Sequence, residues 1–485
     1  MTMEGRSRWL ALLVLCLGDL MIVLDGTIVN VALPTIREDL GFSQESLAWV
    51  VNAYLLTFGG FLLLGGRLGD LFGPRRLFLI GITLFTAASL ACGTATSQEF
   101  LVGARAVQGL GGAVVSAVAL SLIMTLFTEP AERAKAMGVF GFVLSGGGTA
   151  GVLLGGVLTD LLDWHWIFLV NLPVGIGVFA ATLLVLPAVP GHATGRVDFA
   201  GALTVTASLM LAVYAIVNGN DAGWTSLQTL GLLGSSAALM ALFLAIELRV
   251  SAPLMPLGLF RIRNVSTANV VGVLMAGGMF AYFFLSALYL QQILGYSPLE
   301  VGLAYLPGTV IWGASSLVLS DRLVMRFGIK PPLLAGLGLM TVGLLLFART
   351  PVDGNFLVDV LPATIAVGLG AGIGFNPLLL AAMSGVAPTE SGLASGIVNT
   401  AFMMGGAVGL AILASLAASR TESLEASGHG TLAAINGGYH AAFIAGAIFV
   451  VAAAAVGGTL LRADVSAGAH EGEEAIGAPA AAEAD

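Results

Sequence analysis

Two ionisable residues of opposite charge lie alone inside long apolar stretches of this 485-residue sequence. Asp25 falls in an apolar run over residues 9–33, and Arg105 falls in another over residues 100–126. An ionisable side chain inside a membrane is costly, so it is a functional candidate by default. A buried carboxyl group can bind and release a proton, and a guanidinium next to it would offset its desolvation. The two residues are therefore candidates for a functional ion pair inside the membrane.

Helix geometry places the two groups at a similar depth. Asp25 lies about sixteen residues, or ~24 Å, into its segment, and Arg105 lies about five residues, or ~8 Å, into a segment entering from the other side. In a hydrocarbon core ~30 Å thick, both fall in the same half. We expect an ion pair that protonation of Asp25 would open, although a static structural salt bridge is the alternative.

Asp19 is a second acidic residue in the first apolar run. It precedes Asp25 by six positions, which corresponds to ~240° around a helix. The two carboxyl groups therefore do not share a helix face. Asp19 is a candidate for a second proton site or for contact with a cationic substrate, and it could equally face a cavity without a role.

The composition shows that these segments belong to a membrane protein. Hydrophobic residues make up 57% and charged residues 10% of the chain, against roughly 25% charged in soluble domains. Fourteen apolar segments of about membrane length can be placed, and a tail follows them. They cover residues 9–33, 47–66, 77–96, 100–126, 136–159, 165–187, 199–218, 227–247, 265–291, 301–320, 332–349, 357–383, 393–418 and 440–462.

The distribution of basic residues predicts the orientation. Of the 19 Lys and Arg residues, 15 fall in the loops on one side and three in those on the other. Because basic loops stay in the cytoplasm, we expect both termini there. If the segments over 199–218 and 227–247 did not span the membrane, the number of spans would still be even and both termini would stay on the same side. Twelve helices are therefore the main alternative.

An internal repeat predicts two related halves. Gly66–Gly81 and Asp321–Gly336 match at a shift of 255 residues, including Gly73 with Gly328. Repeated halves around a site at mid-membrane are typical of secondary transporters. We expect an all-α membrane fold with a six-helix bundle over 1–190, an inserted helix pair over 191–262, a second six-helix bundle over 263–462 and a disordered cytoplasmic tail over 463–485.

Several other classes are excluded. A net charge of −9 argues against nucleic acid as a partner. Neither lysine completes a phosphate-binding loop, so transport energy must come from an ion gradient or a partner. No spacing of Cys, His or acidic residues suggests a metal site or an enzyme. We expect no cofactor, and we expect lipid, a hydrophobic small molecule and H⁺ as the partners of a monomer.

Six segments in order resemble the fourteen-helix drug:H⁺ antiporters of the major facilitator superfamily. They read LDGTIVNVALP from Leu24, GRLGDLFGPRR from Gly66, RAVQGLGGA from Arg105, GGTAGVLLGG from Gly147, WHWIFLVNLPVG from Trp164 and LQQILGYSPLEVGLAYLP from Leu290. The resemblance implies a bacterial cytoplasmic-membrane exporter of drugs or antibiotics that works by alternating access. It also implies proton coupling through the acid of the first helix and Arg105.

The resemblance assigns two further groups of residues. A loop that switches with conformation would contain Gly66, Gly69, Asp70, Gly73, Arg75 and Arg76. The helix carrying the antiporter motif would contain Gly147, Gly151, Gly155 and Gly156, although Val152 replaces the proline expected there. Setting the membrane topology is the simpler role for the two loop arginines.

Polar residues within the apolar runs are candidates for a substrate cavity, since a large apolar wall with few polar groups suits amphipathic molecules. These residues are Asn30, Asn52, Tyr54, Gln108, Gln291, Gln292, Asn376 and Asn399. For any one of them, an interhelical hydrogen bond is the alternative. A facilitator or exporter of an endogenous metabolite is the rival function. A channel or a membrane enzyme is less well supported.

Overall fold

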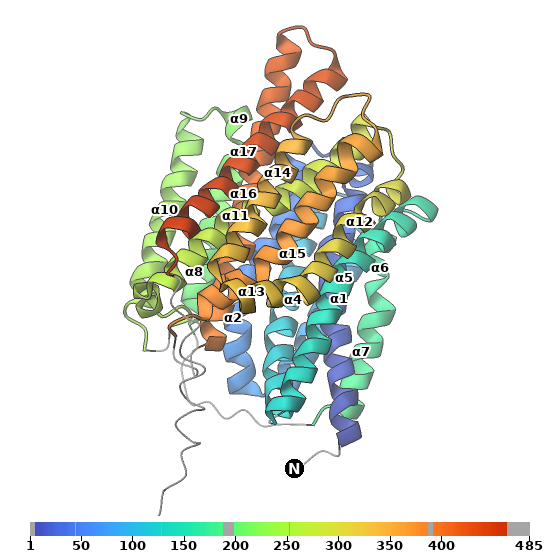
Figure 1. The fold of residues 1–485 in the computed structure, drawn as a ribbon. Helices are drawn as coiled ribbons and strands as arrows, with labels where there is room; N and C mark the ends of the chain where they lie inside the picture. Colours follow the sequence, from blue (N-terminus) through green and yellow to red (C-terminus); the bar gives the residue numbers. More distant parts are fainter. Residues whose placement is uncertain are drawn as a thin grey trace, which may run out of the picture.

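The computed structural model describes residues 5–43, 45–127, 129–187, 198–251, 253–386 and 391–462, and nearly all of them are helical (Figure 1). The tail predicted over 463–485 lies outside this range. The first half contains α1 (Gly5–Leu40), α2 (Trp49–Phe72), α3 (Pro74–Cys92), α4 (Gln98–Leu126), α5 (Pro130–Leu161), α6 (Trp166–Leu169) and α7 (Asn171–Val185). Then follow α8 (Phe199–Val217), α9 (Gly219–Ala222) and α10 (Leu227–Glu247).

The second half repeats this pattern. It contains α11 (Arg263–Leu288), α12 (Pro298–Ala314), α13 (Asp321–Phe327), α14 (Lys330–Phe347), α15 (Leu361–Met383), α16 (Ser391–Ala426) and α17 (Thr431–Leu460). Short π-helical stretches extend α11 and α12 at their ends and α15 at its start. We call the end of the bundle where α1 begins the near end, and the opposite end the far end.

The predicted fold class and helix number are confirmed. Among the described residues, 13 helices are long and apolar enough to cross a membrane. The 32-residue α5 is one more long helix, packed against α1 and α12. Together they give the fourteen long helices that the apolar segments predict.

Several helices are longer than the apolar segments that predict them, most clearly α1 and α16. α1 continues to Leu40, and α16 continues to Ala426 before α17 starts at Thr431. Figure 1 shows the α16–α17 hairpin projecting beyond the other helices at the far end. Hydropathy marks the membrane-buried part of a helix, whereas α16 continues through Ala, Leu and Glu residues, which are good helix formers in water. The segment ends are therefore the least accurate part of the prediction.

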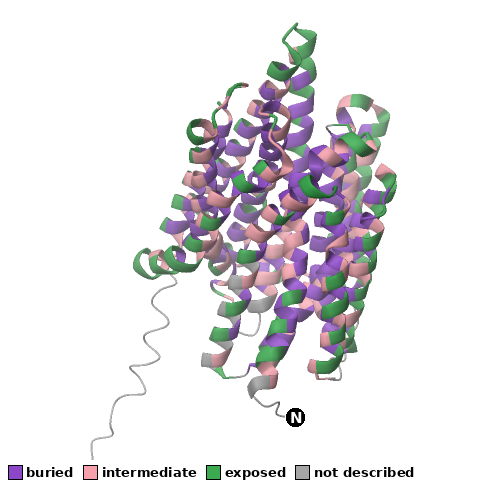
Figure 2. Ribbon diagram, turned by 90° about the vertical axis from the view of Figure 1, so that its right-hand side faces the viewer, coloured by how far each residue is buried: buried purple, intermediate pink, exposed green. Residues whose placement is uncertain are grey.

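Burial separates an inner core from an apolar outer surface. Figure 2 shows buried residues along the inside of the bundle and exposed residues on its outer faces and ends. Leu184 and Leu227 are 86% and 89% exposed, as suits side chains that face lipid. α10 packs mainly against α8, which in turn contacts α2 and α16. The α8–α10 pair thus lies at the outside of the bundle.

The internal repeat has a structural counterpart in two matching turns. Gly73 joins α2 to α3 with φ +91°, and Gly328 joins α13 to α14 with φ +76°. Positive φ favours glycine because a Cβ atom would clash with the backbone. The turn before the following helix is therefore conserved between the two halves of this chain.

Candidate functional site: a buried ion pair in the first half

Asp25 and Arg105 form an ion pair in the interior of the first half. Arg105 Nη1 lies 2.5 Å from Asp25 Oδ2, and both side chains are 0% exposed. Asp25 comes from α1 and Arg105 from α4, two helices that run in opposite directions through the bundle. The structure thus brings together the two groups that were expected at a similar depth in the membrane.

Two amide side chains complete the coordination of the Asp25 carboxylate, and a serine hydroxyl lies behind them. Gln108 Nε2 and Asn171 Nδ2 donate to Asp25 Oδ1 at 2.7 and 3.0 Å. The same two amides donate to Ser89 Oγ at 2.8 and 2.9 Å. These side chains come from α3, α4 and α7, so three helices hold the carboxylate directly or through its donors. Both carboxylate oxygens have partners, as a buried anion requires.

Arg105 is held from three other directions. Its Nε donates to the Val50 carbonyl at 3.0 Å, and its Nη1 donates to Gln108 Oε1 at 2.6 Å. The Tyr54 ring lies 4.3 Å from its guanidinium carbon in a cation–π contact. Its Nη2 is buried without a hydrogen-bond partner. Arg105 therefore keeps most of its contacts if Asp25 becomes neutral.

Asp19 is buried on the same helix but takes part in a separate contact. It is 1% exposed, and its Oδ1 accepts a hydrogen bond of 2.5 Å from Ser116 Oγ on α4. Its Oδ2 is buried without a partner. As the helix geometry predicts, Asp19 and Asp25 have different partners, and Asp19 lies closer to the near end.

The glycines of the motif on α5 fit against two neighbouring helices. A Cβ atom on Gly147 would lie 2.8 Å from the Leu20 side chain, and one on Gly155 would lie 2.6 Å from the Ile28 carbonyl, both on α1. Gly151 faces α1 at Leu24 in the same way, whereas Gly156 faces Pro298 of α12. These glycines thus let α5 approach both α1 and the second half closely.

The loop between α2 and α3 makes contacts within the first half. Arg75 Nη2 donates to the Leu183 carbonyl near the end of α7 at 2.7 Å, whereas Arg76 is exposed. Gly66 and Gly69 face α4. The side chain of Asp70 lies outside the described part of the structure, so its predicted contact with the other half stays a prediction.

The polar residues proposed for a substrate cavity do not gather in one place. Tyr54 and Gln108 belong to the Asp25 network. Gln291 and Gln292 lie at the far end, where Gln291 donates to the Val31 carbonyl at 2.7 Å and Gln292 accepts from Tyr439. The others remain in their own half or their own helix. Asn30 donates within α1, Asn376 donates to Ser316, Asn52 is buried without partners and Asn399 is half-buried.

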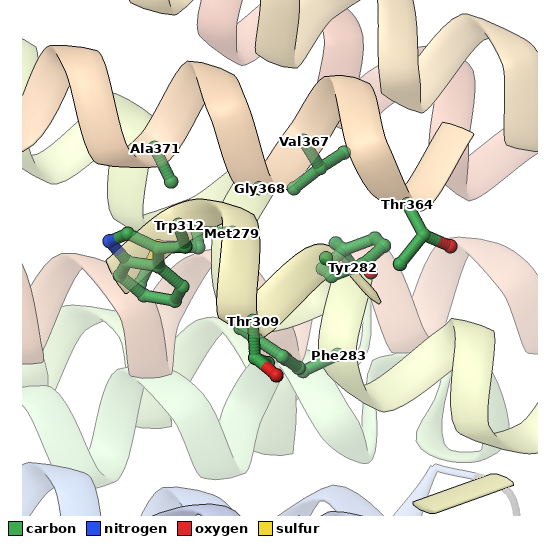
Figure 3. A pocket seen from close by; sticks show the side chains of 10 residues that line it. Met279, Tyr282, Phe283, Thr309, Trp312, Thr364, Val367, Gly368 and Ala371 are labelled. Carbon is green, nitrogen blue, oxygen red and sulfur yellow. The ribbon is translucent and has the colours of Figure 1, made fainter. Parts of the chain in front are cut away.

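A small pocket lies in the second half, away from these polar residues. Figure 3 shows aromatic side chains of α11 and α12 facing α15 across it, among them Tyr282 and Trp312. Phe283 stacks on Trp312 with ring centroids 6.2 Å apart. The sequence reasoning considered only polar residues inside apolar runs, and it therefore missed this aromatic wall.

Ser89 and Asn171 are the two members of the network that sequence reasoning missed. Asn171 is a polar residue at the start of an apolar helix, a signal that could have been used. Ser89 offers no such signal, because serine hydroxyls within membrane helices commonly bond to their own backbone.

Comparison with known proteins gives a consistent family. A profile of the Major Facilitator Superfamily matches residues 15–410. The puromycin resistance protein of Streptomyces alboniger is 40% identical over 89% of this chain and 86% of its own length. The cephamycin export protein of Amycolatopsis lactamdurans is 36% identical, covering 93% of this chain and 92% of that protein. The lincomycin resistance protein of Streptomyces lincolnensis is 38% identical, covering 85% of each.

Solved structures share the fold at low sequence identity. A bacterial homologue of the human lysosomal transporter Spinster, in an inward-facing and occupied conformation, has a TM-score of 0.68 at 16% identity, covering 95% of this chain and 98% of that one. The nucleoside transporter NupG has a TM-score of 0.62 at 13% identity, covering 93% and 100%.

Proposed function

Because this chain belongs to the Major Facilitator Superfamily, we propose that it exports small hydrophobic or amphipathic antibiotics across the bacterial cytoplasmic membrane in exchange for protons. Relatives named for puromycin resistance, cephamycin export and lincomycin resistance support the substrate class. The proton gradient would be the energy source, with no cofactor, and the working unit would be a monomer with both termini in the cytoplasm.

The buried pair of Asp25 and Arg105 is the observation that supports proton coupling. A carboxylate with 0% exposure can remain charged only while its partners stay in place. Removing one charge from a buried pair typically costs about 3–5 kcal/mol. Protonation of Asp25 would therefore change which arrangement of the surrounding helices is favoured.

The geometry suggests how that change would reach the rest of the molecule. Arg105 stays anchored to the Val50 carbonyl and to Gln108, so α1 is the element that protonation releases. α1 packs against α5, and α5 packs against α12 of the second half. Movement of α1 would thus be passed through the α5 glycines to the contact between the halves. Inward proton flow driven by the membrane potential supplies ~2.3 kcal/mol per charge per 100 mV.

The aromatic wall is a candidate contact for an apolar substrate once the helices around it separate, because the space beside it in this conformation is smaller than a drug molecule. Tyr282, Phe283 and Trp312 offer flat apolar surfaces with a polar atom at the edge of two of them. Such surfaces bind amphipathic molecules through contact area rather than through a fixed set of hydrogen bonds. We propose that this wall receives the apolar part of the exported molecule.

Asp25→Asn tests the proposal. Inside-out proteoliposomes with an acidic interior should accumulate puromycin when they contain the wild-type chain. We expect the variant to lose this gradient-driven uptake, because Asn cannot bind and release a proton. Asp163→Asn changes an exposed aspartate and is the matched control, with uptake unchanged. Full gradient-driven uptake by Asp25→Asn would remove Asp25 from the coupling mechanism.

A further inference from the structure

A second buried acidic pair lies outside the Asp25 site, at the near end of the α8–α10 pair. Asp198 directly precedes α8 and Glu247 is the last residue of α10, and they are 5% and 4% exposed. Asp198 Oδ1 accepts a hydrogen bond from the Gly201 amide at 2.7 Å, and Glu247 Oε2 accepts one from the Met255 amide at 3.0 Å. One oxygen of each carboxyl group is thus satisfied by the backbone.

The remaining two oxygens face the same small space. Asp198 Oδ2 and Glu247 Oε1 are both buried without a hydrogen-bond donor. Both oxygens lie next to Gly201. A Cβ atom added to this glycine would contact Asp198 Oδ2 and would lie 2.9 Å from Glu247 Oε1. Because one Cβ position would touch both oxygens, the two carboxyl groups lie close to each other. Ionised carboxylates only accept hydrogen bonds, so two facing each other repel unless one proton lies between them.

No basic side chain compensates the pair within the described residues. The three ion pairs there are Arg8–Glu132, Asp25–Arg105 and His165–Asp163. The neighbouring side chains on α2 are apolar, namely Leu64 and Leu68, which pack with Ala202 and Leu254.

The charged groups on the elements around the pair do not face it. Arg67 on α2 and Arg249 after α10 are exposed, and the charged residues of α16 all lie at its far end. The side chain of Asp70 and the residue Arg196 lie outside the described part of the structure. Among the described residues, no cationic side chain lies next to the two buried oxygens, so a shared proton is what can neutralise one of the two charges.

We propose that Asp198 and Glu247 bind one proton between them and so form a proton-dependent clamp at the near end of the α8–α10 pair. With the proton in place, the start of α8, the end of α10 and the segment at Met255 are joined. Loss of the proton puts two negative charges into a buried space and loosens this junction. The clamp does not depend on the proposed coupling role of Asp25.

Infrared spectroscopy of the purified full chain at neutral pH tests the clamp. We expect a band from a protonated carboxyl group that Asp198→Asn and Glu247→Gln each abolish, because the partner that remains can accept a hydrogen bond from the new amide. Glu425→Gln, at an exposed position of α16, is the control and should leave the band unchanged. A band that survives both substitutions would overturn the proposal.

A second measurement leaves the pair intact, so it does not depend on folding of those variants. The double variant D19N/D25N should keep a protonated-carboxyl band, since the clamp is separate from both aspartates. Absence of that band would contradict the clamp. So would a band in the wild-type chain that appears or disappears when Na⁺ is replaced by choline, because a metal cation would then occupy the space.

Thermal unfolding against pH gives the energetic readout. The folded chain keeps a proton that the unfolded chain releases in the ordinary carboxyl range, so the unfolding midpoint should fall as pH rises from that range to the pH at which the folded pair loses its proton, and level off above it. Glu247→Gln should flatten this fall relative to Glu425→Gln. Parallel curves for the two variants would show that no shared proton contributes to stability.

Discussion

At the scale of single residues, one buried carboxylate accepts hydrogen bonds from three side chains. Asp25 receives hydrogen bonds from Arg105, Gln108 and Asn171, and it has no contact with solvent. This arrangement stabilises the charged form as long as all three donors stay in place. Displacement of any donor would favour uptake of a proton, which links the proton to the positions of α4 and α7.

Arg105→Lys should show that the shape of the guanidinium matters in addition to its charge. An ammonium group lacks the planar set of donors that reaches Asp25, Gln108 and the Val50 carbonyl together. Loss of one charged hydrogen bond costs roughly 1.5–3 kcal/mol. We expect a lower unfolding midpoint in detergent and loss of gradient-driven uptake. Wild-type behaviour in both assays would mean that a point charge is enough.

Asp25 and Arg105 could be predicted from sequence because each is an isolated ionisable residue in an apolar run. Their pairing follows from depth along two antiparallel helices. The contact of the donor Asn171 with Asp25, and the acceptor role of Ser89, could not be predicted in the same way, since they depend on the rotation of α7 and α3 about their own axes. The aromatic pocket was missed because aromatic residues are also ordinary core residues.

At the scale of elements, α5 connects the ion-paired helix to the other half. Its glycines face α1 on one side, and Gly156 faces α12 on the other. Backbones that approach this closely can shift along each other without side chains blocking them. The number of helices and the presence of a glycine-rich helix contact could be predicted from the sequence. The helix ends that extend beyond the membrane could not, as α16 shows.

Gly156→Val should block the contact between the halves. A Cβ atom at Gly156 would lie 2.6 Å from the Pro298 carbonyl and 3.0 Å from Leu299. Overpacking of this kind typically costs about 1–3 kcal/mol. We expect weak or absent puromycin uptake with Asp25 and Arg105 unchanged. Gly148→Val, on the same helix with open space around it, should transport normally. Equal transport by both variants would show that the contact between Gly156 and α12 is not needed for transport.

At the scale of the whole molecule, an even number of spans puts both ends of the chain on one side of the membrane. The near end carries most of the basic loop residues, which predicts that it faces the cytoplasm. The hydrogen bond from Gln291 to the Val31 carbonyl joins the two halves at the far end. This contact belongs to a state that is closed on the far side.

Cysteine labelling should establish the orientation. The native cysteines, Cys16 and Cys92, are both buried. Ser427→Cys, in the exposed far-end hairpin, should react with a membrane-impermeant maleimide in intact cells. Met325→Cys, 79% exposed at the near end, should react only after the cells are permeabilised. The reverse pattern would invert the topology and with it the direction of transport.

Proton release on drug binding tests the central claim most directly. If protonation of Asp25 and substrate binding favour opposite arrangements, each must lower the affinity of the chain for the other. Addition of puromycin to the purified wild-type chain in weakly buffered detergent should therefore acidify the solution, as read by a pH indicator. We expect no acidification with Asp25→Asn at a drug concentration that still saturates it. Equal release by both chains would contradict the account.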